Sequence, residues 1–352
     1  MASIKTVSLL ILLSGIFGCT KTEKSEITKT QEVYIDSLYT FADFESHDIA
    51  NPTEIEITAD DLIAIADYGT QEITLLTPDG KIVSTFGRQG RGPGDFLNIR
   101  HMYDLGDKLA VFDSHANRVT HFDYEGNLLT TYDLPSEAMN KDFTLVNDSL
   151  YVVNREGIEG YLFKLQSLNN NTLQTFGKPN VRWEDRGTLA DSYYELTSGN
   201  TPERQKNRAK LQSDGKYLYV FFEALSAMQK YDLEGNLLWH SNINLPHNKE
   251  IFESKVQSAK KYSSTKSVAI LDYATEFQVI QDHIYILTRR PPGGKQVLVK
   301  LNERQGIETI YHFPEGHEFC FDFDIQPRTN MLYLTNCLSS TVKRAVLPTL
   351  DH

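Results

Sequence analysis

The stretch "FGRQGRGPGDF", Phe86 to Phe96, brings three charged side chains together in a glycine-rich loop. Glycine-rich loops can cradle phosphates, but this one lacks the Lys-Ser/Thr ending of a P-loop and the G-x-G-x-x-G spacing of a dinucleotide turn. A plain connector would not require Arg88, Arg91 and Asp95. We expect these three residues either to latch neighbouring parts of the fold or to line a binding face, and the latch is favoured.

A second group of residues combines aromatic rings with arginines. Trp183, Tyr193 and Tyr194 lie in one polar, charged segment, and Arg289 and Arg290 open the stretch "RRPPGGK". Rigid amphipathic rings beside arginine are typical of surfaces that recognise sugars or peptides. The alternative is that the rings only plug the mouth of a channel.

Histidine and cysteine provide the remaining candidates, because G-x-S-x-G, H-E-x-x-H, EF-hand and C-x-x-C motifs are all absent from the sequence. His101 lies near the start of an expected inner strand, where it either lines a wall or contacts a ligand. Cys320 and Cys337 flank "FDFDIQPRTNMLYLTN". A turn centred between Arg328 and Thr329 would place these cysteines opposite each other, which predicts a disulfide.

Internal repeats indicate which elements position these residues. Two strand-like stretches joined by a tight turn recur five times, and the turn residues are spaced by 46, 45, 64 and 71 residues: Gly80, Gly126, Asn171, Gly235 and Gly306. A period near 45 with alternating β-branched and aromatic residues is typical of four-stranded propeller blades. The two longer spacings indicate insertions at about residues 178–207 and 243–274.

A sixth unit, which starts at Leu332, lacks its outer strand, whereas residues 31–38 are strand-like and belong to no complete unit. Pairing of residues 31–38 with the last blade would remove both exposed edges. The sequence therefore predicts an all-β, six-bladed propeller of four-stranded antiparallel blades over residues 31–352, with its ring closed by the N-terminal strand. A β-sandwich with long loops would not explain why the chain ends one strand short.

The N-terminus has the pattern of an export signal. Residues 1–18 carry Lys5 as their only charge and an apolar run that is too short for a membrane span. Because Cys19 follows Gly18, the segment resembles a bacterial lipoprotein signal, in which Cys19 is the lipidated first residue of the mature chain and residues 19–30 form a flexible tether. The alternative is ordinary secretion with Cys19 lost or free.

The charge balance bears on possible partners. The net charge is −12, or −13 once Lys5 is removed with the signal, and it is spread along the chain without long blocks of one sign. A nucleic-acid partner is therefore not expected. The expected location is the cell envelope, periplasmic or at the outer membrane, with the protein held by a lipid anchor.

The stretch "LAVFDSHANRVTHFDYEGNLL" is similar to the NHL-type repeat, and the loop quoted first resembles a signature of six-bladed β-propeller lipoproteins of the TolB-like superfamily in bacterial envelopes. Members of this group are mostly without known activity, so the resemblance informs fold rather than function. Propellers of the gluconolactonase type hold calcium at the axis with oxygen ligands. That resemblance implies, as an alternative, a calcium site whose ligands lie at the starts of the expected inner strands: Glu54, Asn98, Asp142 and Glu276. Otherwise no cofactor is expected.

The long connectors fall on one face of the expected propeller, and tight turns fall on the other. Long loops on a rigid scaffold are where binding usually resides. We therefore expect the insertion-bearing face to bind an unknown protein, peptide or carbohydrate without catalysis. The alternative function is that of a calcium-dependent lactonase-like or lyase-like enzyme.

Overall fold

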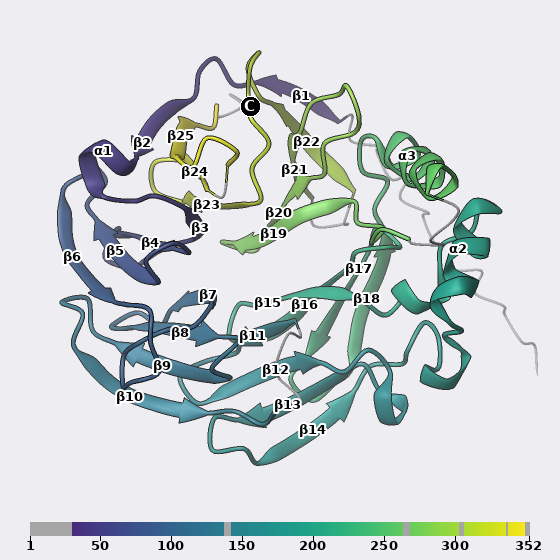
Figure 1. Ribbon diagram of the computed structural model, residues 1–352, viewed down its shortest axis with the longest axis horizontal. Helices are drawn as coiled ribbons and strands as arrows, with labels where there is room; N and C mark the ends of the chain where they lie inside the picture. Colours follow the sequence, from purple (N-terminus) through teal and green to yellow (C-terminus); the bar gives the residue numbers. More distant parts are fainter. Residues whose placement is uncertain (1–29, 137–141, 263–267, 303–305, 336, 349–352) are drawn as a thin grey trace, which may run out of the picture.

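A computed structural model describes residues 30–136, 142–262, 268–302, 306–335 and 337–348 of the chain. These residues form six β-sheets arranged as a ring around a central axis (Figure 1). Four of the sheets consist of four consecutive antiparallel strands, and the other two each include one strand from the N-terminal segment. The six-bladed propeller predicted from the sequence is confirmed.

Each blade runs from an inner strand at the axis to an outer strand at the rim. The first three blades are β3–β6 (Pro52–Ile57, Ile63–Asp67, Glu72–Leu76, Ile82–Gly87), β7–β10 (Ile99–Asp104, Leu109–Asp113, Arg118–Phe122, Leu128–Asp133) and β11–β14 (Phe143–Leu145, Leu150–Asn154, Phe163–Ser167, Thr172–Phe176). The last three are β15–β18 (Ala209–Ser213, Tyr217–Phe222, Ala227–Asp232, Leu237–Asn242), β19–β22 (Ala274–Ile280, His283–Thr288, Val297–Leu301, Ile307–His312) and β23–β25 (Asp322–Gln326, Met331–Thr335, Val342–Val346).

The N-terminal segment closes the ring with a different stretch from the one that the sequence indicates. Strand β2 (Tyr39–Ala42) pairs antiparallel with β25 and supplies the outer strand of the sixth blade. Strand β1 (Gln31–Tyr34) instead pairs parallel with β22 and becomes a fifth strand of the fifth blade. The expected closing strand over residues 31–38 is thus corrected to residues 39–42, and the N-terminal segment covers the outer edges of two blades.

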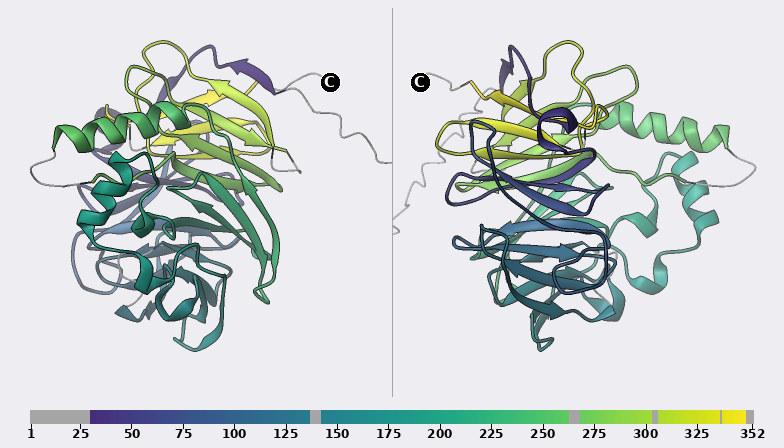
Figure 2. Two further views of the ribbon diagram at one scale, coloured as in Figure 1. Left: turned by 90° about the vertical axis from the view of Figure 1, so that its right-hand side faces the viewer. Right: turned by 60° about the vertical axis from the view of Figure 1, so that its left-hand side comes forward.

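The connectors divide the molecule into two faces. The insertion face carries the links from the second to the third strand and from each blade to the next, whereas the turn face carries the remaining short turns. Helices α2 (Leu189–Thr197) and α3 (Asn248–Lys261) contact each other and lie together on the insertion face (Figure 2). The shorter helical turns are α1 (Phe44–His47), η2 (Ile158–Gly160), η3 (Trp183–Asp185) and η4 (Glu203–Gln205). Of the helices in the described ranges, none is long and apolar enough to cross a membrane.

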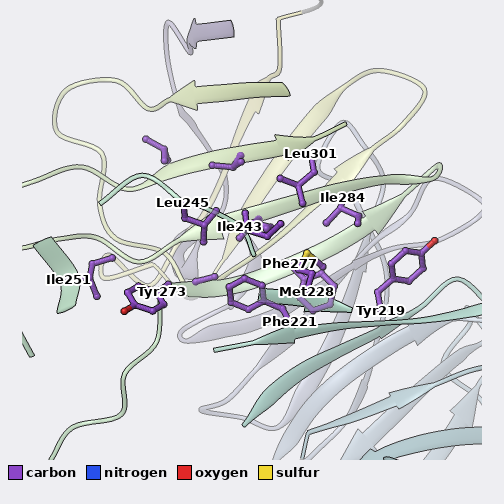
Figure 3. Packing of buried hydrophobic residues seen from close by; sticks show 14 of the residues in the cluster. Tyr219, Phe221, Met228, Ile243, Leu245, Ile251, Tyr273, Phe277, Ile284 and Leu301 are labelled. Carbon is purple, nitrogen blue, oxygen red and sulfur yellow. The ribbon is translucent and has the colours of Figure 1, made fainter. Parts of the chain in front are cut away.

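Apolar side chains fill the spaces between neighbouring blades. Between the fourth and fifth blades, Phe221 and Met228 pack with Phe277 and Ile284, and Ile251 of α3 joins the same cluster (Figure 3). The second and third strands of the first five blades are mostly buried, as is the second strand of the sixth. These inter-blade layers form the hydrophobic core, and they hold the inner strands rigidly around the axis.

A disulfide ties the last blade together. Strands β23 and β24 pair in the register Asp322 with Thr335, and Cys320 and Cys337 lie two positions beyond that pair in the same register. The two cysteines are bonded, with their Cα atoms 4.0 Å apart. The turn centre expected from the sequence is therefore the one that the structure has.

Candidate functional site: the axial channel

Three cavities lie along the propeller axis, and the smallest of them, about 220 Å³, is lined by Arg289 together with Glu54, Arg100 and Lys210. The turn-face cavity has a volume of about 1100 Å³ and is lined by the inner strands of the blades together with the short turns that follow them. The insertion-face pocket has a volume of about 310 Å³ and is lined by residues of the second, third and fourth blades. The largest cavity therefore lies on the face opposite to the one expected from the positions of the insertions.

Carboxyl groups dominate the wall of the turn-face cavity. The two cations and one histidine at its wall are Lys108, Arg328 and His101. Lys108 lies 3.6 Å from Asp148, and Arg328 is paired with Asp61, so both cations are already neutralised. All six blades contribute to the ten carboxyl side chains: Glu54, Glu56, Asp61, Asp104, Asp107, Asp148, Asp214, Glu276, Asp322 and Asp324. The cavity is thus strongly acidic in composition.

The local sequence explains why carboxyl groups face the axis. In β3 the alternation "EIEI" buries Ile55 in the core and places Glu54 and Glu56 at the cavity wall. In β23 the alternation "DFDI" does the same for Asp322 and Asp324. Because successive side chains of a strand point to opposite sides, this period-2 pattern separates core residues from lumen residues.

The carboxylates of β23 also join the last blade to the first. Asp322 accepts a hydrogen bond from the backbone N–H of Ile55 (3.0 Å), and Asp324 accepts one from Ile57 (2.8 Å). In the same way Glu56 accepts from the N–H of Asp104 in the second blade (2.9 Å). The inner strands have open edges toward the axis, so these side chains satisfy donors that a sheet partner would otherwise take.

Burial shifts the pKa values of these carboxyl groups upward. Burial raises the pKa of Glu54 to about 8, and that of Asp324 to about 7. Burial also raises the pKa of Glu56 and of Asp322 well above the usual range, and neighbouring carboxyl groups add to both shifts. A buried carboxyl group without a cation nearby favours its neutral form. The channel wall therefore holds protons near neutral pH that a bound cation would displace.

His101 lies at the middle of the channel, where the sequence analysis expects it. Its Nδ1 lies 3.5 Å from Oε2 of Glu54, whereas its Nε2 is buried and has no hydrogen-bond partner among the described residues. Burial, reinforced by the positive charge of Arg100, lowers the pKa of His101 to about 3. The imidazole is therefore neutral at physiological pH.

Ion pairs cross the channel toward the insertion face. Lys210 of β15 lies 3.1 Å from Glu276 of β19, and so joins the fourth and fifth blades. Arg208 lies 3.2 Å from Glu223 within the fourth blade. Burial alone would lower the pKa of Lys210, but Glu276, Glu223 and Asp142 outweigh it and raise that pKa. This end of the channel has mixed charge, in contrast to the acidic turn-face cavity.

The glycine-rich loop between the first two blades is latched to the protein. Asp95 is buried and accepts hydrogen bonds from Nε of Arg88 (2.8 Å) and from the N–H of Gly92 (2.9 Å). The hydrogen bond from Arg88, followed by that from Gly92, lowers the pKa of Asp95. Arg118 of β9 donates to the carbonyl oxygens of Arg91, Gly92 and Asp95. The loop is therefore held through its backbone by Arg118, and the side chain of Arg91 is exposed.

Glycine is required in this loop because the carboxylate of Asp95 packs against the chain. A Cβ atom at Gly90 would lie 2.4 Å from Oδ2 of Asp95, and one at Gly87, where φ is +84°, would lie 2.7 Å from the ring of Phe96. Contacts this short cannot be accommodated without movement of the loop. The glycines therefore allow Phe96 and the carboxylate of Asp95 to pack directly against the backbone of the connector.

In the first two blades, Asp67 and Asp113 accept hydrogen bonds from backbone N–H groups of the segment that leads into the blade. Asp113 accepts from the N–H groups of Leu97 (2.7 Å), Asn98 (3.1 Å), His115 (3.0 Å) and Ala116 (2.8 Å). Asp67 makes the matching set of four contacts in the first blade. In each of these two blades, one carboxylate thus links the segment before the first strand to the turn after the second strand.

The aromatic candidates and Arg290 lie outside the axial cavities, whereas Arg289 lines the smallest of them. Trp183 is 45% exposed and stacks on Arg186, whose guanidinium carbon is 4.3 Å from the ring centroid. Tyr193 and Tyr194 on α2 pack edge to face, with centroids 5.4 Å apart. These rings form a surface patch on the insertion face, away from the residues that line the channel.

The two arginines of "RRPPGGK" differ in their surroundings. Arg289 donates from Nε to Asp272 (2.6 Å) and lies over the rings of Phe319 and Phe321. Arg290 is exposed and donates to the carbonyl oxygen of Gly294 (2.8 Å). The guanidinium of Arg289 thus forms an ion pair with the buried Asp272, whereas that of Arg290 stabilises the turn in which it lies.

The alternative calcium set does not gather at one point. Asn98 and Asp142 line the insertion-face pocket, whereas Glu54 and Glu276 line the turn-face cavity. In the described part of the chain, no group of three or more His, Cys, Asp or Glu side chains is arranged to hold a metal ion. The oxygen donors therefore do not fit a preformed calcium site.

The sequence analysis misses several residues that line the channel. Arg100, Lys210 and Glu223 lie in or next to strands that were expected, yet no motif marks them. A signal was available for others, because "EIEI" and "FDFD" place carboxylates at alternate positions of otherwise apolar strands. The predicted lipidation site, Cys19, lies outside the described residues.

The comparison with protein families agrees with this geometry. A family model described as a 6-bladed beta-propeller, DUF5128, matches residues 19–223, which is more than half of the chain. The chain belongs to the DUF5128 family. A search of the curated proteins gave no match.

Solved structures share the fold of this DUF5128 member at low sequence identity. A member of the DUF4221 family from Bacteroides vulgatus is 10% identical, covers 90% of this chain and 98% of its own, and has a TM-score of 0.56. A putative exported protein from Bacteroides fragilis is 12% identical, with 87% of each chain covered and a TM-score of 0.52. A streptogramin B lyase is 11% identical, with 88% of this chain and 96% of the lyase covered and a TM-score of 0.50. At this identity the likeness concerns the fold alone.

Proposed function

We propose that the protein is a lipid-anchored binding protein of the cell envelope that takes a small cationic ligand into the turn-face cavity. The observation that carries this proposal is the cavity wall, to which all six blades contribute carboxyl groups. Propeller channels of this size hold small molecules rather than folded partners. No catalysis is required for such a role, which is consistent with the absence of hydrolytic motifs from the sequence.

Charge complementarity favours a cation over other ligands. The two cations at the wall are already paired with rim carboxylates, so they offer little to an anion. Several of the deeper carboxyl groups hold protons because burial raises their pKa values. A bound cation would pair with the ionised carboxylates and displace the protons that the buried carboxyl groups hold. Affinity for the cation should therefore rise with pH.

A lipid anchor at Cys19 would place the turn face near the membrane. Strand β1 runs parallel to β22, so Gln31 lies beside Thr309, at the end of β22 that adjoins the turn face. Thr30 donates to the carbonyl oxygen of Ile307 at the same end (3.1 Å). The dozen residues between Cys19 and this point span at most about 40 Å when extended. The family match that begins at Cys19 supports a mature chain that starts there.

The ligand part of the proposal is tested with agmatine as a probe. Its guanidinium and primary amine stay doubly charged near neutral pH because such groups titrate above about pH 10. Calorimetric titration at about pH 8 should detect binding, and Glu54→Gln combined with Glu56→Gln should weaken that binding about tenfold or more. The control is Glu253→Gln on α3, a glutamate that is 57% exposed and far from the axis. Absence of agmatine binding at millimolar concentrations would refute the proposal.

The anchor is tested separately. Cys19→Ser should move the protein from the membrane fraction to the soluble fraction of cells, and mass spectrometry of the wild-type protein should find an acylated N-terminal cysteine. An unmodified N-terminus with the signal removed elsewhere would refute the anchor without affecting the ligand proposal.

A second candidate function is a lyase-like activity, and one observation favours it. His101 lines the channel and lies 3.5 Å from Glu54, so a histidine and a carboxyl group, the residue types of general acid–base catalysis, stand side by side at the cavity wall. A lyase-like activity would also require calcium, although the four candidate oxygen ligands lie in two different cavities. Calcium titration monitored by melting temperature, together with turnover assays on cyclic esters for wild type and His101→Ala, distinguishes the two functions. Turnover that is lost in His101→Ala would establish the enzyme.

A further inference from the structure

Two charged side chains in the insertion-face pocket are left without partners after its ion pairs are formed. The pocket contains three cations and three carboxylates, and most of them are matched. Arg208 pairs with Glu223 (3.2 Å) and Lys210 with Glu276 (3.1 Å). Glu156 pairs with Arg186 (3.1 Å). Within the described ranges, no hydrogen bond or ion pair is formed by the side chain of Arg100 or of Asp142.

Arg100 and Asp142 come from adjacent blades and face the same small space. Arg100 lies in β7, and Asp142 directly precedes β11. Both line the pocket of about 310 Å³, yet they are too far apart to form an ion pair with each other. Each still influences the other electrostatically, since Asp142 helps to raise the pKa of Arg100. An unpaired cation and an unpaired carboxyl group therefore stand on two sides of one polar pocket.

We propose that the insertion-face pocket binds a zwitterionic α-amino acid, with the carboxylate of the ligand at Arg100 and its ammonium group at Asp142. A guanidinium can hold a carboxylate through two parallel hydrogen bonds. The rest of the wall suits a small polar molecule, since Asn98, Ser114 and Asn154 offer amide and hydroxyl groups. This site lies at the opposite end of the channel from the cation site at the turn face.

The environment of the pocket adds a pH dependence to this binding. Burial raises the pKa of Asp142 to about 7, with Lys210 opposing the shift and Glu223 adding to it. A ligand ammonium pairs with the ionised form of Asp142. Below the pKa of Asp142 the ligand must compete with a proton, so the affinity should be higher at about pH 8 than at about pH 6.

The test uses calorimetric titration with glycine, L-alanine and L-asparagine on the full chain. Propionate and ethylamine, which carry only one of the two charges, are the ligand controls. The protein variants are Arg100→Gln and Asp142→Asn. Their matched controls are Lys249→Gln and Glu253→Gln, an exposed pair on α3 at 83% and 57% side-chain exposure.

We expect at least one amino acid to bind, propionate and ethylamine to bind about tenfold or more weakly, and each pocket variant to lose about tenfold or more in affinity. The melting temperatures of both pocket variants should stay close to that of wild type, because neither side chain has a partner to lose. The absence of binding for all three amino acids, or equal binding by wild type and both pocket variants, would overturn the proposal. Retained agmatine binding in Arg100→Gln and Asp142→Asn would show that the turn-face site is independent.

Discussion

Two sets of buried carboxylates in this propeller differ in how they are satisfied. Asp67 and Asp113, between the blades, each accept four hydrogen bonds from backbone N–H groups. Glu54, at the axis, accepts none within the described ranges, and the positive charge of Arg100 offsets only part of the effect of burial on its pKa. The comparison indicates that a buried carboxylate with a full set of donors maintains the fold, whereas one without donors is available to protons and ligands.

The largest expected effect comes from the removal of a fully satisfied carboxylate. Asp113→Ala leaves four N–H groups without an acceptor at the junction of the first two blades, so we expect the free energy of unfolding to fall by about 3 kcal/mol. Urea unfolding followed by tryptophan fluorescence measures the change. A loss below about 0.5 kcal/mol would mean that the junction does not depend on this carboxylate.

The matched variant at the axis should behave differently. Glu54→Gln replaces a carboxyl group that is largely protonated at neutral pH, since burial raises its pKa to about 8, by a neutral amide of the same shape. We expect a change within about 0.5 kcal/mol in the same urea experiment. A loss as large as that of Asp113→Ala would remove the distinction between the two sets.

The glycine-rich loop gives an intermediate effect. Arg118→Ala removes the guanidinium that binds three loop carbonyl groups and should cost about 2 kcal/mol. Arg91→Ala removes an exposed side chain and should change stability by less than about 0.5 kcal/mol. Thermal unfolding of the two variants compares them directly. Equal losses would show that the Arg91 side chain, and not only its carbonyl oxygen, forms part of the latch.

The axial groups should also produce a pH dependence of stability, and their contributions have opposite signs. The folded pKa of Glu54 is raised to about 8, so the folded state holds an extra proton and stability falls as pH rises toward that value. The folded pKa of His101 is lowered to about 3, so stability falls as pH drops below about 6.5.

The slopes of the two groups cancel between about pH 4.5 and 6.5, the ordinary pKa values of Glu54 and His101, so stability should be greatest across that range. Stability should fall below about pH 4.5 through His101 and above about pH 6.5 through Glu54, by at most about 1.4 kcal/mol per pH unit. Melting temperatures from about pH 3 to about pH 8 measure the profile. Glu54→Gln should remove the fall above about pH 6.5, turn the level range into a rise with pH, and leave the fall below about pH 4.5 unchanged. A profile that is the same in wild type and in Glu54→Gln would contradict the shift assigned to this residue.

The architecture could be predicted from the sequence because it is repeated. Turn glycines such as Gly80 and Gly126, spaced by about 45 residues, mark the blades independently of any contact between them. The closing strand was misplaced by several residues because "QEVY" and "YTFA" are both strand-like, and only the packing decides which of them covers which blade.

The candidate site was harder to predict because it is assembled from all six blades. Glu54, Arg100 and Asp322 are far apart in sequence, and each is a single charged residue in an ordinary strand. The long insertions indicated the opposite face, yet they contribute α2 and α3, which pack on each other beside the ring. His101 was identified because its position at the start of an inner strand places it at the axis whatever the loops do.

The most direct test of the central claim, that the axial carboxyl groups with raised pKa values form a cation site, is the number of protons released when agmatine binds. Calorimetric titrations at about pH 7.5 in buffers with different ionisation enthalpies give this number. The account predicts release of about one proton or more per agmatine, because the bound cation favours the ionised forms of Glu54, Glu56 and Asp324. Binding without proton release, or release that is unchanged in the variant carrying both Glu54→Gln and Glu56→Gln, would contradict it.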